Sequence, residues 1–394
     1  MTKESLSLME PLIPSEKNMR DLDDIVLDLI AKSNRLAGKL NPTVQTSIGN
    51  LVRSMNCYYS NLIEDHNTHP KDIDKALTKQ YSKNKQKRDL QKEAVAHIEV
   101  QRMIDNEKDI KRHPASLEYV LWIHKEFCSR LPKDLLIVTN EETNEKLEVI
   151  PGELRKNEVI VGRHIPPNNK NLERFLNRFE EKFTSEKLSK IQQIISIGAA
   201  HHRLLWIHPF LDGNGRVTRL VSHAMMLKLG IGSSLWSISR GLARNITNYK
   251  QLLMAADNPR HGDRDGRGNL SEQALIDFCK FFIQICIDQI EYMESLIQPE
   301  ELLRRIELYA RDEVNAERLP KGSLALLREA LFVGEFERGK APEITGYKDR
   351  AARKVLSALV KKGLLVSDTP KSAVRLAFPY EEVVERWFPK LYPE

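Results

Sequence analysis

The sequence has few cysteines, no long apolar run and little excess of either charge. Its four cysteines among 394 residues form no Cys-x-x-Cys pair and no metal-ligand spacing, so we expect reduced, mostly buried thiols rather than disulfides or a zinc site. No apolar stretch approaches the length of a membrane span, and the first residues lack the basic and apolar regions of a signal peptide. We therefore expect a cytoplasmic protein without membrane contact. The net charge of +6 permits nucleic-acid binding without arguing for it.

Helical periodicity dominates what is present. The length suffices for two or three domains, and the pattern predicts a mainly α fold with an extended polar arm over the first 20 residues. We predict an N-terminal helical region at residues 1–110, a central domain at 111–298 and a C-terminal domain at 299–394. One strand-like segment, at 147–167, contains a Val-Ile-Val run and predicts a hairpin.

Residues 208–219 hold the densest group of chemically useful side chains. They read His-Pro-Phe-Leu-Asp-Gly-Asn-Gly-Arg-Val-Thr-Arg and lie between two apolar, helix-periodic stretches, at 188–206 and 217–229. The segment is therefore expected to be a loop that enters a helix. Glycines flanking Asn214 let the backbone N–H groups approach an anion, and the helix dipole favours negative charge there. The pattern predicts a phosphate cradle.

The side chains of this segment fit the same chemistry. Arg216 and Arg219 are three residues apart and share a helix face, where their planar guanidinium groups suit phosphate oxygens. Asp212 offers a hard oxygen ligand for Mg²⁺, and the ordinary pKa of a histidine suits His208 to proton transfer. Taken singly, each is typical of a turn, a cap or a surface position, but the combination within twelve residues has no common structural purpose. His201 and His202 invite a metal hypothesis, which we disfavour because no carboxylate or thiol set accompanies them.

The segment resembles the signature of the Fic family, His-x-Phe-x-Asp/Glu-Gly-Asn-Gly-Arg-x-x-Arg, and matches it at every specified position. The resemblance extends over about residues 45–290 and implies a Fic-type helical bundle that transfers AMP from ATP to a Ser, Thr or Tyr hydroxyl of a protein, with pyrophosphate leaving. It implies that His208 deprotonates the acceptor, that Asp212 holds Mg²⁺ and that Phe210 anchors the loop in the core. The implied nucleotide contacts are Asp212, Gly213, Asn214, Gly215, Arg216, Arg219 and, near the adenine, Tyr249.

The predicted hairpin also resembles the flap that lies beside the active site in this family. A hairpin edge can pair with an extended target segment through backbone hydrogen bonds. Such a flap would hold the acceptor hydroxyl over His208. The residues expected in this target-docking flap are Glu153, Leu154, Arg155, Val159, Ile160, Val161 and Gly162.

A glutamate upstream matches a regulatory pattern of the same family. Ser60 and Glu64 lie four residues apart near the end of a predicted helix at about 45–66, and many relatives carry Ser/Thr-x-x-x-Glu-Gly/Asn there. The resemblance implies that Glu64 pairs with Arg219 and displaces the γ-phosphate, because one guanidinium cannot bind a carboxylate and a phosphate in bidentate fashion at once. Asp65 departs from the pattern, where Gly or Asn is usual. The same glutamate could instead help to remove AMP.

The C-terminal part is predicted to contain helices at 322–336, 341–345 and 348–362, followed by a hairpin at 364–377. This order resembles a winged helix-turn-helix domain, and cations on the third helix could contact DNA phosphates through residues 322–377. Such domains also serve for dimerisation or protein docking, which leaves a homodimer open.

Three functions therefore compete. The leading one is a Mg²⁺-dependent protein adenylyltransferase that uses ATP, is restrained by Glu64 and modifies a target protein, itself included. A second is a Fic enzyme that removes AMP or transfers UMP or phosphate, although the resemblance disfavours phosphate transfer, because the relatives that transfer phosphate deviate at the position of the intact Gly215. A third is a DNA-binding regulator with a nucleotide-sensing domain.

Overall fold

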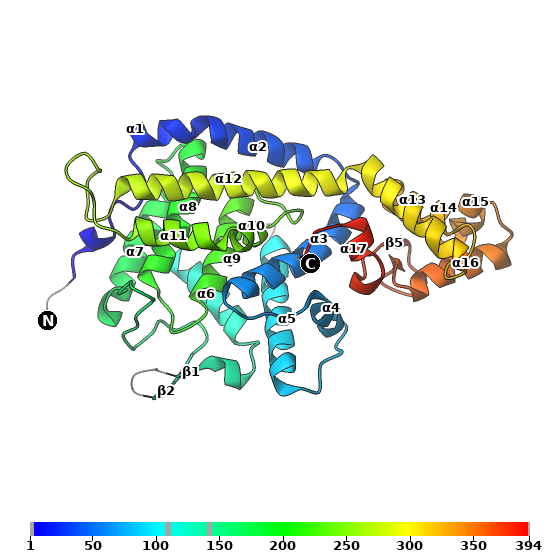
Figure 1. Ribbon diagram of the computed structural model, residues 1–394, viewed down its shortest axis with the longest axis horizontal. Coiled ribbons are helices and arrows are strands. Elements are labelled where there is room, and N and C mark those ends of the chain that lie inside the picture. Colours follow the sequence, from blue (N-terminus) through cyan, green and yellow to red (C-terminus); the bar gives the residue numbers. More distant parts are fainter. Residues whose placement is uncertain (1–3, 107–111, 140–143, 393–394) are drawn as a thin grey trace.

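The computed structural model describes residues 4–106, 112–139 and 144–392, which form a mainly helical protein, as predicted (Figure 1). The N-terminal part contains α1 (Glu16–Met19), α2 (Asp23–Ala37), α3 (Pro42–Ile63), α4 (Pro70–Leu77) and α5 (Lys85–Asn106). The central part contains α6 (Leu117–Cys128), α7 (Leu172–Phe183), α8 (Lys190–Ile207), α9 (Asn214–Lys228), α10 (Ile238–Arg244), α11 (Ile246–Ala256) and α12 (Glu272–Ile297). The C-terminal part contains α13 (Pro299–Asn315), α14 (Ser323–Val333), α15 (Ala341–Thr345), α16 (Asp349–Lys361) and α17 (Glu385–Trp387). Among these described residues, no helix combines the length and the apolar character needed to cross a membrane.

The two helices predicted around residues 208–213 are present and pack against each other. A capping box between Ser189 and Gln192 starts α8, and His208 ends it in a left-handed conformation. Gly213, also left-handed, precedes α9. The loop between them is thus fixed by a helix end on one side and a helix start on the other.

The three predicted parts share one continuous hydrophobic core. Helix α2 lies along α12, and α3 packs on α10 and α5 (Figure 1). Helix α13 begins at Pro299, and the domain boundary expected at 299 stays a prediction, while the boundary at 110 lies outside the described residues. The extended arm was a wrong prediction: Met9 and Leu12 are buried, and the Nη2 of Arg203 donates to the Pro11 carbonyl at 2.8 Å. These apolar residues fold the arm onto the core because docking removes them from water.

The hairpin lies upstream of the predicted one. Strands β1 (Ile137–Thr139) and β2 (Lys146–Glu148) pair antiparallel, with Ile137 opposite Glu148. The strand expected at 159–161 is absent, and only an isolated bridge joins Val161 to His164. Arg155 binds the carbonyls of Asn157 and Pro167 and so closes this segment as a loop, which outweighs the β propensity of the Val-Ile-Val run.

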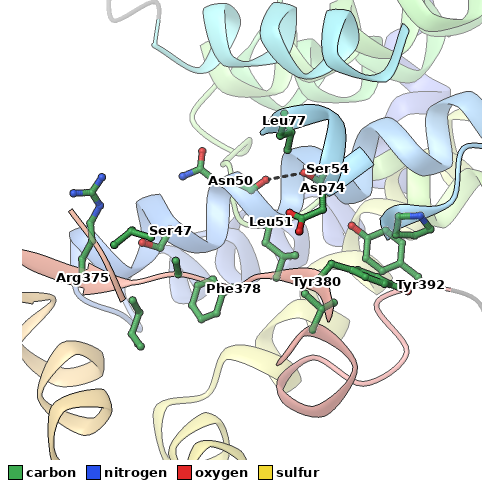
Figure 2. A pocket seen from close by; sticks show the side chains of 15 residues that line it. Ser47, Asn50, Leu51, Ser54, Asp74, Leu77, Arg375, Phe378, Tyr380 and Tyr392 are labelled. Atoms are coloured by element: carbon green, nitrogen blue, oxygen red, sulfur yellow. Dashed lines mark hydrogen bonds between the residues drawn. The ribbon is translucent and has the colours of Figure 1, made fainter. Parts of the chain in front are cut away.

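The C-terminal part follows the predicted order, with one added strand. Strand β3 (Glu335–Phe336) follows α14, whose end is set by Gly334 at φ +93°, and joins β4 (Leu365–Val366) and β5 (Val374–Leu376) in a sheet of order β3-β5-β4. The chain then returns to α3, where the Tyr59 hydroxyl donates to the Leu391 carbonyl at 3.0 Å. A cavity of about 150 Å³ lies at this junction, and Figure 2 shows the side chains of α3, α4 and the C-terminal segment that line it. The end of helix α3 that contacts the C-terminal segment through Tyr59 also carries Ser60 and Glu64.

Candidate functional site

His208 stands where α8 ends and the glycine-containing loop begins. Its φ is +49°, and its backbone N–H donates to Leu204 O at 3.1 Å. Burial lowers the pKa of His208 to about 4, and the nearby charges of Arg155 and His164 act in the same direction. The ring is therefore neutral at pH 7 and can accept a proton from a hydroxyl.

Phe210 anchors the loop in the core, as expected. It is fully buried, and its ring stacks on that of His124 from α6. The side-chain amide of Asn214 closes the loop from within: its Oδ1 accepts from Phe210 N at 2.9 Å and its Nδ2 donates to Phe210 O at 2.8 Å. Because its side chain is used in this way, the group that Asn214 could contribute to the predicted phosphate cradle is its backbone N–H.

The two glycines shape the start of α9. Gly213 has a φ of +82°, which L side chains rarely adopt. The N–H of Val217 is bonded to Gly213 O, and the three preceding N–H groups belong to the helix start, where no intrahelical acceptor exists. A Cβ at Gly215 would overlap Oε1 of Glu64. A carboxylate thus lies directly against the predicted anion cradle.

Glu64 ends α3 and pairs with Arg219, the contact that the resemblance implied. Its Oε1 accepts from Nη2 of Arg219 at 2.6 Å. Ser60, one turn earlier, accepts from Arg219 Nε at 2.9 Å through its hydroxyl and from Nη2 at 2.9 Å through its carbonyl. Burial acts to raise the pKa of Glu64, but the charges of Arg219 and Arg216 outweigh it and the pKa is lowered. Glu64 is therefore an anion at neutral pH.

Arg216 has a partner that the sequence did not reveal. Its Nη1 donates to Oε1 of Glu93, a buried residue of α5, and His66 lies 2.8 Å from the other oxygen of that carboxylate. Burial lowers the pKa of Arg216 to about 10. No spacing in the sequence connects residues 66, 93 and 216, because three separate elements bring them together.

Asp212 lies at the rim of the loop, with its side chain 46% exposed. Its Oδ1 accepts from Gly213 N at 2.6 Å. Among the described residues no cluster of three or more His, Cys, Asp or Glu could hold a metal ion. One accessible carboxylate beside a phosphate cradle nevertheless fits Mg²⁺, which commonly takes one or two carboxylates together with substrate phosphates.

The flap segment is fastened to the loop by Arg155. The guanidinium donates through Nε to His208 O at 2.8 Å, through Nη1 to Asn157 O at 2.9 Å and through Nη2 to Pro167 O at 2.5 Å. Its side chain is buried and binds carbonyls of its own chain, so Arg155 fixes the shape of the segment, and docking of a target on the flap stays a prediction. The tip remains open to solvent, with Ile160 68% and Ile165 74% exposed.

Tyr249 of α11 and the paired histidines of α8 form a set of buried polar contacts that reaches α9. Tyr249 is buried, and its hydroxyl lies 2.8 Å from Nε2 of His201, whose Nδ1 lies 2.9 Å from Ser222. His202 faces the Leu253 carbonyl and Asp257. These contacts make Tyr249 part of a packed polar network, and its contact with an adenine stays a prediction.

Comparison with known proteins identifies a family domain in the part of the chain that contains this loop. Residues 114–226 match the model of the Fic/DOC family, so the chain contains a Fic/DOC domain, and Glu64 lies outside the matched region. The protein adenylyltransferase Fic of Drosophila erecta is 37% identical over 98 residues, and that of Drosophila willistoni is 36% identical over the same length. Each match covers 25% of this chain and 20% of the relative, so the similarity spans about a fifth of the length of these relatives.

Two solved structures share the fold. Fic-1 from C. elegans has a TM-score of 0.54 at 15% identity, covering 70% of this chain and 73% of its own. A Fic domain containing signaling protein from Bacteroides thetaiotaomicron has a TM-score of 0.51 at 17% identity, covering 68% and 96%. The predicted Fic-type helical fold is thereby confirmed.

Proposed function

We propose that this chain is a protein adenylyltransferase whose nucleotide site is restrained by Glu64. The observation that carries the proposal is the position of the Glu64 carboxylate, which pairs with Arg219 and lies against Gly215 at the start of α9. A carboxylate bound there by a guanidinium and a helix N-terminus occupies a place suited to a phosphate group. The relatives named protein adenylyltransferase support AMP as the transferred group.

The proposed reaction follows from the residues around the loop. The oxygen of a protein hydroxyl attacks the α-phosphorus of ATP, the bond from that phosphorus to the bridging oxygen breaks, and pyrophosphate leaves. His208 takes the hydroxyl proton, for which its neutral ring is suited. The N–H groups at the start of α9 and the guanidinium of Arg216 stabilise charge that develops on the phosphate oxygens. Asp212 would hold Mg²⁺, which when bound neutralises phosphate charge.

The experiment compares the wild type with Glu64→Gly and with Glu64→Gly/His208→Ala. Each is incubated with ATP labelled at the α-phosphate, Mg²⁺ and a cell lysate. We expect Glu64→Gly to incorporate at least about tenfold more label, because Arg219 is then free for the nucleotide. The double variant is expected to lose incorporation while it still binds ATP by calorimetry. Equal incorporation by the wild type and Glu64→Gly at saturating Mg-ATP would contradict restraint by Glu64.

Other labels distinguish the rival enzymes. Label from the γ-phosphate would indicate phosphate transfer, label from UTP would indicate UMP transfer, and loss of label from a previously modified target would indicate removal of AMP. Incorporation only from the α-phosphate of ATP is the result expected here.

A second candidate function is supported by helix α16. Arg350, Lys354 and Lys361 fall on one exposed face of this helix, in a part of the molecule remote from α9 (Figure 1). The order of helices and strands around it resembles a winged helix-turn-helix, whose third helix enters the major groove. Binding of the full chain to a DNA duplex should then weaken steeply with salt, with a log-log slope of about −3 if three phosphates are neutralised. A triple Arg350→Ala/Lys354→Ala/Lys361→Ala variant with an unchanged slope would exclude this surface.

A further inference from the structure

Arg216 is a buried cation of the site. Its side chain is 4% exposed, its guanidinium carbon lies 5.2 Å from the centre of the Phe127 ring, and its Nη2 lies 3.4 Å from Oδ1 of Asp212. Its Nε has no acceptor among the described residues. The guanidinium therefore keeps unused donors although it is already held at Nη1 by Glu93.

Glu93 and Glu64 bind the two motif arginines in different ways. The Glu93 side chain is 1% exposed and comes from the middle of α5, which packs on α3, α6 and α9. The Glu64 side chain is 31% exposed and belongs to the residue that caps α3, next to Asp65 at φ +61°. A nucleotide can displace a carboxylate that reaches solvent, whereas displacing Glu93 would leave a buried charge without a partner, which is strongly unfavourable.

His66 completes this arrangement. Its Nδ1 lies 2.8 and 3.1 Å from the two oxygens of Glu93. A carboxylate can only accept hydrogen bonds, so Nδ1 carries the proton and donates to Glu93. The Glu93 carboxylate is thus fixed from both sides, by an imidazole at the rim and by a guanidinium inside.

We infer that Glu93, oriented by His66, is a positioning residue that holds the Arg216 guanidinium in the pose required to bind the phosphates of the nucleotide. The inference rests on the proposed nucleotide site and adds to it a division of roles between two carboxylates. Glu64 competes with the nucleotide for Arg219, whereas Glu93 holds Arg216 in the orientation that binds the nucleotide. A cation held in place before binding loses less rotamer entropy when the phosphate arrives.

The test measures nucleotide binding directly, in the Glu64→Gly background and without any transfer step. Mg-ATP is titrated by calorimetry into Glu64→Gly, Glu64→Gly/Glu93→Gln and Glu64→Gly/Glu99→Gln. Glu99 is the matched control, because it lies on the same helix and pairs with Arg130 away from the cradle. We expect Glu93→Gln to raise the Kd for Mg-ATP about tenfold and Glu99→Gln to leave it unchanged.

A second ligand separates positioning from general damage. Adenosine, followed by NMR titration, has no phosphate, so its affinity should be equal in the Glu93 and Glu99 variants. Should Glu93→Gln fail to fold, His66→Ala replaces it, since this rim residue is expected to raise the Kd for Mg-ATP about threefold. Equal or tighter Mg-ATP binding in the folded Glu93→Gln or His66→Ala variant would overturn the inference, as would an equal loss of adenosine binding. Absence of Mg-ATP binding in Glu64→Gly itself would instead overturn the proposed function.

Discussion

The ring of His124 stacks on the ring of Phe210, with centroids 3.8 Å apart and planes 4° from parallel. The same histidine accepts a hydrogen bond from the backbone N–H of Gly152 at 2.9 Å through Nδ1. It therefore joins α6, the base of the flap segment and the loop that carries His208. His124 lies outside the 208–219 motif, yet it supports the loop from the outside while Asn214 closes it from within.

Replacing His124 should loosen the loop. His124→Ala removes the stacking partner of Phe210 and the acceptor for Gly152, so we expect a loss of about 2–4 kcal/mol in the free energy of unfolding. In the Glu64→Gly background, label incorporation should fall by at least about tenfold, since a small displacement of His208 misaligns the base. Denaturant titration and the α-labelled ATP assay measure the two effects. A His124→Ala protein with unchanged stability and activity would contradict the role of the stack.

Gly215 should tolerate no side chain, for two separate reasons. In the wild type, a Cβ at residue 215 would collide with the Glu64 carboxylate and weaken its pair with Arg219. In Glu64→Gly that collision is absent, but the Cβ still stands where a phosphate must approach the start of α9. We expect Gly215→Ala not to raise incorporation by the wild type above its restrained level, and to reduce incorporation by Glu64→Gly at least about tenfold. Activation of the wild type by Gly215→Ala would show that the cradle admits a methyl group.

The contiguous part of the site was predictable from sequence, and the assembled part was not. In residues 208–219, glycine placement and helix spacing determine the loop and the helix face from which Arg216 and Arg219 project. The helices and hairpin of the C-terminal part were likewise readable from periodicity and turn residues. Glu93 and His124 come from other helices, and only packing brings them to the loop.

The Glu64–Arg219 pair and the conformation of residues 159–161 could not be derived from the local sequence pattern alone. The Glu64–Arg219 pair was expected from the family resemblance, since a carboxylate near a helix end is usually a solvated side chain. The strand predicted for the Val-Ile-Val run was wrong. High β propensity produces a strand only where a partner strand is available for pairing, and this run has none among the described residues. Here the neighbouring carbonyls bind Arg155 instead, and Ile160 is left in solvent.

Buried histidines should make the fold sensitive to acid. Burial lowers the pKa of His97 to about 3 and that of His113 to about 4. An unfolded chain takes up these protons below pH 6.5 while the folded chain does not, so the free energy of unfolding decreases as the pH falls from 6.5 towards 4. Each such histidine contributes about 1.4 kcal/mol per pH unit in this window.

The contribution of His97 can be isolated by substitution. Neither ring nitrogen of His97 has a partner among the described residues, so His97→Leu breaks no hydrogen bond there. The two side chains are similar in volume, and the substitution should remove one proton uptake on unfolding. Urea titrations at pH 7, 6 and 5 should give a stability profile that is flatter than that of the wild type by about 1.4 kcal/mol per pH unit below pH 6.5. Parallel profiles would mean that His97 is protonated in the folded protein.

Arg155 should act on the rate of transfer rather than on nucleotide binding. It holds the carbonyl of His208 and two carbonyls of the flap segment, and it touches none of the residues expected to bind phosphates. In the Glu64→Gly background, Arg155→Ala leaves three carbonyls without their donor and frees the base and the flap to move apart. We expect kcat to fall at least about tenfold, with a KM for ATP within about twofold of the parent. Arg155→Lys retains one donor group in place of the planar fork, so its kcat should lie between those of the Glu64→Gly parent and the Arg155→Ala variant. Because the phosphate contacts remain, a rise in KM at constant kcat would mean that Arg155 serves the nucleotide and not the alignment of His208.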